Sequence, residues 1–179
     1  TQPSGLSADI TQATQTITFG ALTAVNYGGA NFNLTATASS GLTVTYTSSN
    51  PAVATVSGNT VTIVGVGTTT ITASQSGNAS VAPATDVAQT LTVNQATQTI
   101  TFAALPNKLL TDIPFALTAT ASSGLTVTYT SSNTAVATVT GNTVTIVGLG
   151  STVITASQSG NANYAAATSV NQTQVVSAP

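Results

Sequence analysis

Hydrophobic and polar residues alternate along most of the chain with a period of two. In the segment 42–47 (Leu-Thr-Val-Thr-Tyr-Thr) every second residue is Thr, and the segment 60–63 (Thr-Val-Thr-Ile) repeats this alternation. Such a pattern is typical of a β-strand that has one buried and one solvated face. No segment shows the helical period over a useful length. The pattern therefore predicts an all-β protein.

Turn-forming residues separate the alternating segments at short intervals. Ser39-Ser40-Gly41 and Gly58-Asn59 are two such turns. The strands expected between the turns are 14–19, 32–38, 42–48, 52–56, 59–64, 68–75 and 86–93. About seven short antiparallel strands predict two packed sheets, that is, an immunoglobulin-like β-sandwich.

The chain contains the same sequence unit twice. Gln12–Phe19 returns as Gln95–Phe102, an offset of 83 residues, and Leu34–Asn50 returns letter for letter as Leu117–Asn133. A unit of fixed length that recurs in this way is typical of a tandem array. The fold class expected is therefore all-β, with two tandem immunoglobulin-like domains. The expected division is an extended N-terminal lead-in (1–11), a first sandwich repeat (12–94) and a second sandwich repeat (95–179).

Two motifs carry a family resemblance. The segments 44–56 (Val-Thr-Tyr-Thr-Ser-Ser-Asn-Pro-Ala-Val-Ala-Thr-Val) and 58–73, with its Gly-Val-Gly turn and Ile-Thr-Ala strand, resemble the bacterial immunoglobulin-like domain of group 2. Tyr46 and Tyr129 stand where that family usually has Trp, and we expect both rings in equivalent core positions. The resemblance implies stalks of bacterial surface adhesins of the intimin and invasin type, or spacer modules in cell-wall proteins. It brings no catalytic residues to this chain.

Charge is nearly absent. Charged residues make up 2% of the sequence, against about a quarter in ordinary domains, and His and Cys do not occur. Without imidazole, thiolate or paired carboxylates, we predict that the protein is not an enzyme and has no cofactor and no metal site. One cation cannot support nucleic-acid binding, and no apolar run is long enough to insert into a membrane. The low charge suits a secreted or cell-surface protein, and the resemblance implies a bacterial one.

Candidate binding residues follow from the positions at which the two repeats differ. The connection 23–31 differs from its counterpart 106–114 more than any other segment does, and loops on a constant scaffold often carry recognition. Drift in a tolerant loop remains the alternative. Lys108 and Asp112 also raise the question of an intramolecular isopeptide bond, but the first repeat has no Lys at all. Asp86 raises that of a Ca²⁺ site, but Ca²⁺ takes six to eight oxygen ligands, usually from several carboxylates. The candidate binding-loop residues are Tyr27, Asn31, Lys108, Asp112 and Tyr164.

Two functions remain open at this point. The first is a rigid structural segment, either a subunit of a surface fibre or part of an adhesin stalk, because the junction 91–100 contains neither Gly nor Pro. In a fibre the chain would associate head to tail with itself or with other surface proteins. The second is an adhesive module that recognises a carbohydrate or cell-surface ligand through the divergent loops. The candidate assembly contacts are Leu6, Ile10, Val175 and Val176.

Overall fold

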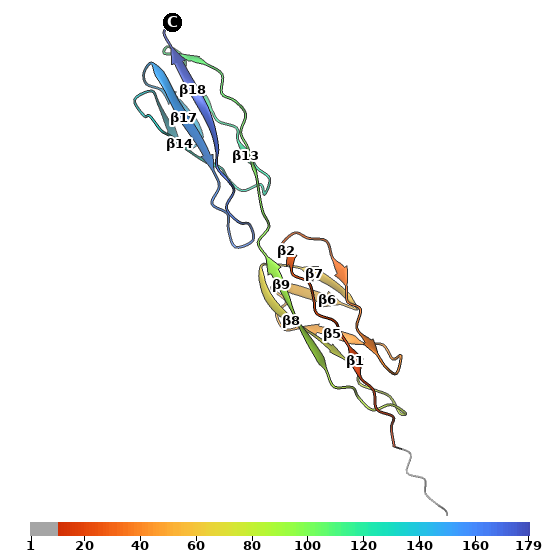
Figure 1. The fold of residues 1–179 in the computed structure, drawn as a ribbon. Coiled ribbons are helices and arrows are strands. Elements are labelled where there is room, and N and C mark those ends of the chain that lie inside the picture. The colour runs from red at the N-terminus through yellow and green to blue at the C-terminus, as the bar shows by residue number, and fades with distance from the viewer. Residues whose placement is uncertain (1–10) are drawn as a thin grey trace, which may run out of the picture. The chain divides into compact units, whose positions relative to one another are not determined.

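The computed structural model describes residues 11–179, and this range consists of β-strands and their connections (Figure 1). The chain divides between Asn94 and Gln95 into two compact units. Among the described residues there is no helix that could cross a membrane. The all-β, tandem sandwich architecture expected from the alternation is confirmed.

The first unit is built from nine short strands in two layers. One layer is the four-stranded sheet β2-β9-β8-β5; the other contains the three-stranded sheet β3-β7-β6 and the strand pair β1-β4. The strands are β1 (Ile17–Thr18), β2 (Val25–Asn26), β3 (Phe32–Asn33), β4 (Thr37–Ala38), β5 (Thr45–Ser48), β6 (Ala54–Ser57), β7 (Thr60–Ile63), β8 (Gly67–Ser74) and β9 (Val87–Asn94).

The second unit repeats this topology strand for strand. Its sheets are β11-β18-β17-β14 and β12-β16-β15, with the pair β10-β13. The strands are β10 (Ile100–Thr101), β11 (Lys108–Leu109), β12 (Phe115–Ala116), β13 (Thr120–Ala121), β14 (Thr128–Ser131), β15 (Ala137–Thr140), β16 (Thr143–Ile146), β17 (Gly150–Ser157) and β18 (Val170–Ser177).

The expected strand 32–38 is in fact two strands with different partners. Its first part, β3, pairs with β7, and its last part, β4, pairs with β1. Between them Leu34 N donates to Asn59 O at 2.8 Å, and Ala36 O accepts the hydroxyl of Tyr46. The chain therefore changes neighbours in mid-segment, which residue alternation alone does not reveal.

The strand β2 was missed because it lies inside the expected loop 23–31. It is held by parallel pairing of Val25 with Val93 on β9, and Tyr27 N donates to Asn94 O at 2.9 Å. A two-residue strand has no measurable alternation. Its existence depends on a long-range partner rather than on its own sequence.

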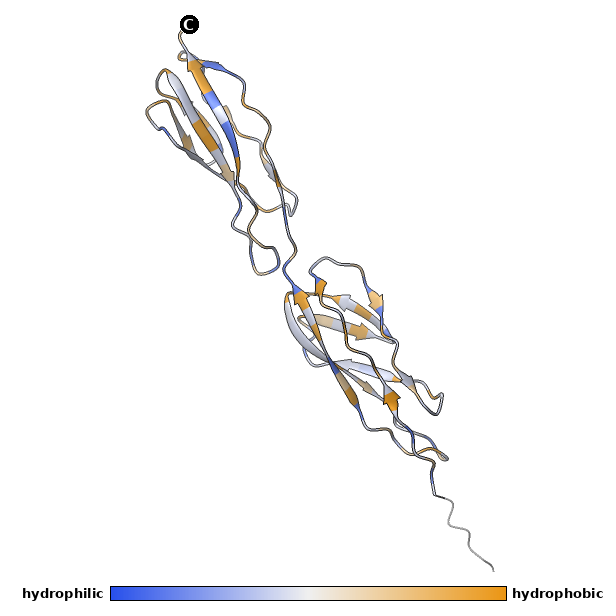
Figure 2. Ribbon diagram, viewed as in Figure 1, coloured by the Kyte–Doolittle hydropathy of each residue, from blue (hydrophilic) through white to orange (hydrophobic). Residues whose placement is uncertain are grey.

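The core of each unit is formed by alternate residues of the long central strands. Ile71, Leu91 and Val61 are fully buried in the first unit, while the Thr residues between such positions remain more accessible; Figure 2 shows the corresponding hydropathy along the strands. Ile154 and Val144 are the counterparts of Ile71 and Val61 in the second unit. The period of two thus sets which side chains enter the core.

Tyr46 and Tyr129 occupy equivalent positions, as predicted, but these positions lie beside the cores and not within them. The ring of Tyr46 meets Phe19 edge to face at 5.8 Å, and Tyr129 meets Phe102 at 5.7 Å. The Tyr46 hydroxyl donates to Ala36 O at 3.3 Å, and the Tyr129 hydroxyl makes the matching bond at 3.4 Å. Both rings are half-buried, so each one closes the side of a core rather than filling its centre.

Candidate functional site

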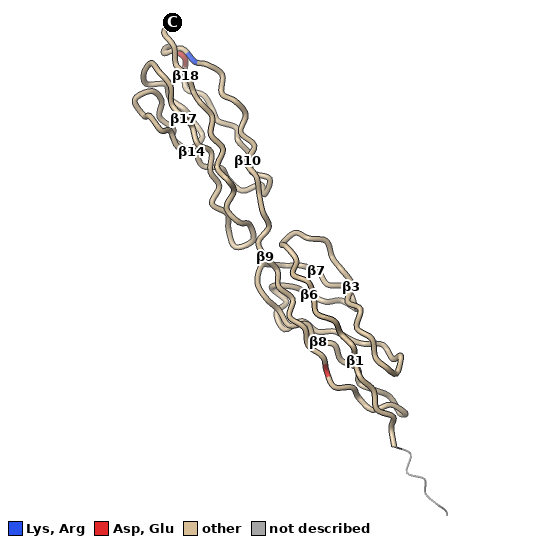
Figure 3. Tube along the Cα trace, viewed as in Figure 1, with Lys and Arg blue, Asp and Glu red and all other residues tan. Residues whose placement is uncertain are grey.

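The three charged side chains of the described range lie in two places. Lys108 and Asp112 lie together at the end of the second unit where β18 finishes, whereas Asp86 lies in the first unit, just before β9 (Figure 3). No group of three His, Cys, Asp or Glu side chains that could hold a metal ion occurs among residues 11–179. The Lys108 end is therefore the candidate site that we examine from its residues upward.

The backbone at this end is positioned by β18. Lys108 and Leu109 form β11, which pairs in parallel with Val176 and Ser177. The pairing continues past the strand, because Leu110 N donates to Ser177 O at 3.0 Å. β11 thus becomes the edge of a four-stranded sheet, with β18 on one side only.

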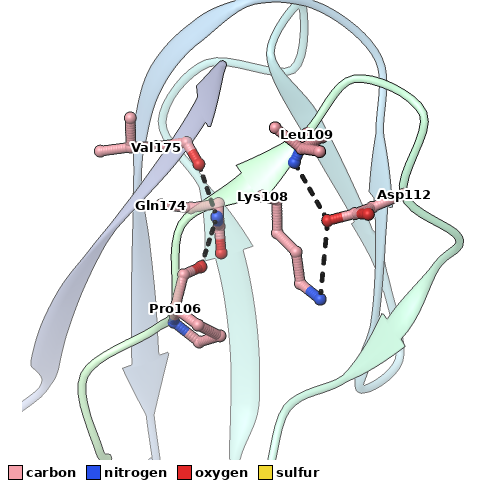
Figure 4. Close-up of polar contacts among 6 residues, drawn as sticks. All are labelled: Pro106, Lys108, Leu109, Asp112, Gln174 and Val175. Atoms are coloured by element: carbon pink, nitrogen blue, oxygen red, sulfur yellow. Dashed lines mark hydrogen bonds and ion pairs between the residues drawn. The ribbon is translucent and has the colours of Figure 1, made fainter. Parts of the chain in front are cut away.

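Asp112 closes the turn that follows β11. Its Oδ2 accepts from Leu109 N at 3.0 Å (Figure 4). Its own N–H donates to Leu109 O at 3.0 Å. Lys108 Nζ lies 3.9 Å from the same oxygen and 4.9 Å from the centre of the Phe115 ring. A partly exposed ion pair of this kind contributes at most about 1 kcal/mol. The main role of Asp112 is therefore to hold the turn, as Asp side chains do when they accept a nearby backbone N–H.

Gln174 supports the same loop from inside the unit. Its side chain is fully buried, and its Nε2 donates to Pro106 O at 3.0 Å and to Val175 O at 2.9 Å (Figure 4). Its Oε1 is buried and has no hydrogen-bond partner. The counterpart in the first unit is the buried apolar Leu91. Sequence reasoning missed Gln174, although comparing the repeats position by position would have found this polar residue in a core register.

Large apolar side chains are exposed around Lys108. Five of the six large hydrophobic residues that are exposed in the described part of the chain belong to this end of the second unit, and Ile113 is 82% accessible. β11 and β17 flank β18 here, since both Lys108 and Gly150 pair with Val176. We call this surface the apolar end. Its residues are Leu109, Leu110, Ile113, Val147 and Leu149.

The structure brings together only some of the predicted binding residues. Lys108 and Asp112 are in contact, but Tyr164 lies at the opposite end of the same unit, where it forms a bridge with Ala96 before β18 begins. Tyr27 packs partly against the core of the first unit, and Asn31 is exposed in that unit. The five residues therefore do not form one site within a unit.

The predicted assembly contacts have different surroundings. Val175 is half-buried, and Val176 is 3% exposed within the core of its own unit, so the Val176 side chain already has partners there. Leu6 and Ile10 lie outside the described residues. The exposed apolar residues at this end are instead those of the neighbouring loops.

Each unit also has an open groove between the segment that contains β4 or β13 and the segment that leads into β5 or β14. In the first unit it measures about 750 Å³ and is lined by residues such as Leu34, Ala36 and Tyr46. The second unit has a counterpart of about 420 Å³ lined by the same residue types. No charged side chain lines either groove. Because it recurs in both units, the groove is a property of the shared scaffold.

A comparison with known protein families found a match within the first repeat. Residues 30–82, which run from just before β3 to the connection ahead of β9, match the family model described as "Intimin, immunoglobulin-like domain". The resemblance to bacterial immunoglobulin-like domains is confirmed. The match covers less than half of the chain. No curated protein matches the sequence.

Solved structures of tandem β-domains are similar over most of the chain. The S-layer protein rSbsC(31-844) shows 21% identity over 96% of this chain and 29% of its own length, with a TM-score of 0.41. Domains 4 and 5 of the S-layer protein SbsC show 25% identity, coverage of 82% and 83%, and a TM-score of 0.37. Drosophila N-cadherin EC1-4 shows 11% identity, coverage of 93% and 50%, and a TM-score of 0.37. The chain spans less than a third of the length of the first of these proteins. Since all three TM-scores are below 0.5, these likenesses carry no argument about function.

Proposed function

We propose that the chain is a non-enzymatic structural segment of a bacterial extracellular fibre or adhesin stalk. The family match supports the coarser statement, an extracellular structural or adhesive role. The finer proposal rests on one observation: the interior of the first unit, including its polar contacts, is rebuilt in the second unit. A repeated scaffold of this kind suits a protein whose task is to span a distance.

The duplicated polar contacts show how completely the interior is shared. Gln15 Nε2 donates to Ala82 O at 2.8 Å, and its counterpart Gln98 donates to Ala165 O at 2.7 Å. Both Gln side chains are buried. Such satisfied buried amides fix the packing of the segments they join. By contrast, none of the four charged residues has a charged counterpart in the other repeat.

The strand order of each unit also suits a protein under tension. In the first unit β2 is an early strand and β9 is the last, and the two pair in parallel. β11 and β18 have the same relation in the second unit. When a unit is pulled from its two ends, parallel strands slide along each other, and their hydrogen bonds are strained together rather than one at a time. This arrangement resists extension.

Pulling a single molecule from its ends tests the proposal. We expect two unfolding events, each of which extends one unit to a contour length of roughly 280 Å, because about 83 residues extend at about 3.4 Å each. Leu110→Pro removes the N–H that donates to Ser177 O and should lower the force of one event only. Leu110→Ala keeps the N–H and is the matched control. Two units that extend without distinct force peaks, or a Pro variant as resistant as the control, would argue against the role.

A further inference from the structure

One edge of the four-stranded sheet in each unit has free backbone groups. β5 is the last strand of the order β2-β9-β8-β5, and β14 has the same place in the second unit. Ser49 N donates to Thr70 O at 3.0 Å, which continues the register of β5 on β8. Because bonded and non-bonded positions alternate in an antiparallel ladder, Thr47 directs its N–H and C=O towards β8, whereas Tyr46 and Ser48 direct theirs outward. No hydrogen bond to these outward groups is found in the part of the chain that the structure describes.

Two other edge strands are closed by their own chain. At β11, Leu109 N donates to Asp112 Oδ2, and Leu109 O accepts from Asp112 N. At β6, Ala54 N donates to Asn50 O at 3.2 Å. The outward backbone groups of β5 and β14 have no such bonds among the described residues. We therefore call β5 and β14 the open edges of the two units.

The sequence of the open edges contains nothing that would block an added strand. Natural proteins commonly protect an edge strand with Lys, with Pro or with a bulge. The segment 34–50, which contains β5 and is identical to 117–133, has no charged residue and no Pro. β5 pairs with β8 without a break in register from Thr45 to Ser48, so no bulge turns this edge away. A neutral strand meets no charge repulsion at either open edge.

The groove of each unit lies along the same edge. In the first unit its lining includes Val44 and Tyr46 on the β5 side and Leu34 and Ala36 on the β4 side. A strand added beside β5 would lie next to the mouth of this groove and would remove part of the apolar lining from water. Since no charged side chain lines the groove, an uncharged strand fits it best.

The open edge of a second copy meets these requirements. It is uncharged, and β8 already holds it in an extended conformation, so pairing does not have to order a loose segment. Its free groups belong to Tyr46 and Ser48, which are two residues apart. Two such strands that run antiparallel bring these groups opposite each other. Every chain supplies this edge twice, because β5 and β14 have the same sequence.

We propose that the open edge of one chain pairs antiparallel with the open edge of a second copy, with Thr47 opposite Thr47 of the second copy. In this register Tyr46 lies opposite Ser48, so that their outward N–H and C=O groups bond and each large ring has a small neighbour. The two Thr47 side chains form a cross-strand pair at the centre. The contact uses the same surface of both chains and has twofold symmetry. Thr130 takes the place of Thr47 when β14 is the edge that pairs.

Cysteine cross-linking of the full-length chain tests the register, because the natural sequence has no Cys. Non-bonded partners in an antiparallel pair have Cα atoms about 4.5 Å apart, which is within the range of a disulfide. Thr47→Cys should therefore give disulfide-linked dimers when a mild oxidant is added. Thr45→Cys is the matched control, because Thr45 is also exposed on the same face of β5. In the proposed register it lies about 14 Å from its equivalent in the second copy and should not cross-link.

Charge placed at the centre of the contact tests the association itself. Thr47→Lys combined with Thr130→Lys puts like charges opposite each other and should weaken association at least about tenfold in sedimentation velocity. A chain with Thr47→Glu and Thr130→Glu should also associate weakly alone, but an equal mixture of the two chains should recover the association. Thr68→Lys with Ser151→Lys adds the same charge at exposed positions of β8 and β17, inside the sheets, and is the matched control.

The outcomes decide on this contact without deciding on the structural role. Equal cross-linking of Thr45→Cys and Thr47→Cys, or a double Lys variant that associates like the wild-type chain, overturns the proposed pairing. A wild-type chain that stays monomeric at every concentration also overturns it and leaves the open edge to a partner other than a second copy. The pulling experiment measures the strength of a single chain, so either result can fail without the other.

Discussion

Replacing Gln174 by Leu is expected to stabilise the second unit. Gln174 is fully buried, and its Oε1 has no partner, so folding removes this oxygen from water without replacing the lost hydrogen bond. Leu91 shows that the same position in the first unit accepts an apolar side chain of similar size. The substitution therefore gives the second unit the residue that the first unit already buries at this position.

The expected change in the free energy of unfolding is the difference between two gains and one loss. Removing a buried unpaired polar atom gains about 1–3 kcal/mol, and burying a Leu side chain gains about 1.5–3 kcal/mol. The loss of two hydrogen bonds from Nε2, to Pro106 O and Val175 O, costs about 0.5–1.5 kcal/mol each. Pro106 is exposed, so water can replace the lost donor at its carbonyl. The net effect should be a stabilisation of about 2 kcal/mol.

Differential scanning calorimetry of the full chain measures the effect. A gain of about 2 kcal/mol should raise the melting temperature of the second unit by roughly 8–16 °C, at about 4–8 °C per kcal/mol for a domain of this size. The reverse change, Leu91→Gln, should lower the melting of the first unit by at least as much. If Gln174→Leu destabilises its unit, the two Nε2 bonds outweigh the unpaired oxygen, and the reasoning is refuted.

Three further outcomes can be measured on the same material. Thermal stability should change by only a few degrees between about pH 4 and pH 9, because the buried polar contacts are made by neutral amides, hydroxyls and backbone groups; a drop of fifteen degrees on the acid side would contradict this. Tyr129→Ala should cost about 3 kcal/mol in chemical denaturation, whereas Tyr129→Phe should cost about 1 kcal/mol, since it loses only the bond to Ala119 O. Gly160→Ala should be strongly destabilising, because its φ is +77° and an added Cβ would lie 2.3 Å from Tyr164 O. Gly141→Ala should cost less, because φ is +59° there but the space around the residue is open. Equal melting temperatures of the two variants would count against the steric argument.

The sequence predicted the fold well because its main signals are local. Thr alternates with apolar residues along the segments that became β8 and β17, and this alternation determines which side chains are buried. The turns at Gly58 and Gly141 have positive φ, as the Gly-Asn pairs suggested. What the sequence did not show was β2 and β11, because a two-residue strand depends on its partner and not on its own pattern.

The site was predicted only in part, because the sequence shows directly which residues are charged but not which apolar residues are buried. Lys108 and Asp112 attracted attention because charges are rare in this chain, and the structure indeed places them in contact. Val176 was chosen for being apolar near the chain end, yet an apolar residue in a regular strand register belongs to the core of its own unit. Leu110 and Ile113, in the loop after β11, are outside any such register, and their side chains are exposed.

Comparing equivalent positions of the two repeats shows where the second unit departs from the first in both its interior and its surface. Position 174 is Gln where the first unit has the buried Leu91, and positions 109, 110 and 113 are Leu, Leu and Ile where the first unit has Asn, Tyr and Ala. Neither change favours the stability of an isolated unit, since one buries an unpaired oxygen and the other exposes apolar surface. The two differences are also neighbours in space, because Gln174 Nε2 donates to Pro106 O at the start of the loop. The variant Leu109→Asn, Leu110→Tyr and Ile113→Ala gives this loop the residues of the first unit, and it should therefore melt at a temperature no lower than that of the wild-type chain.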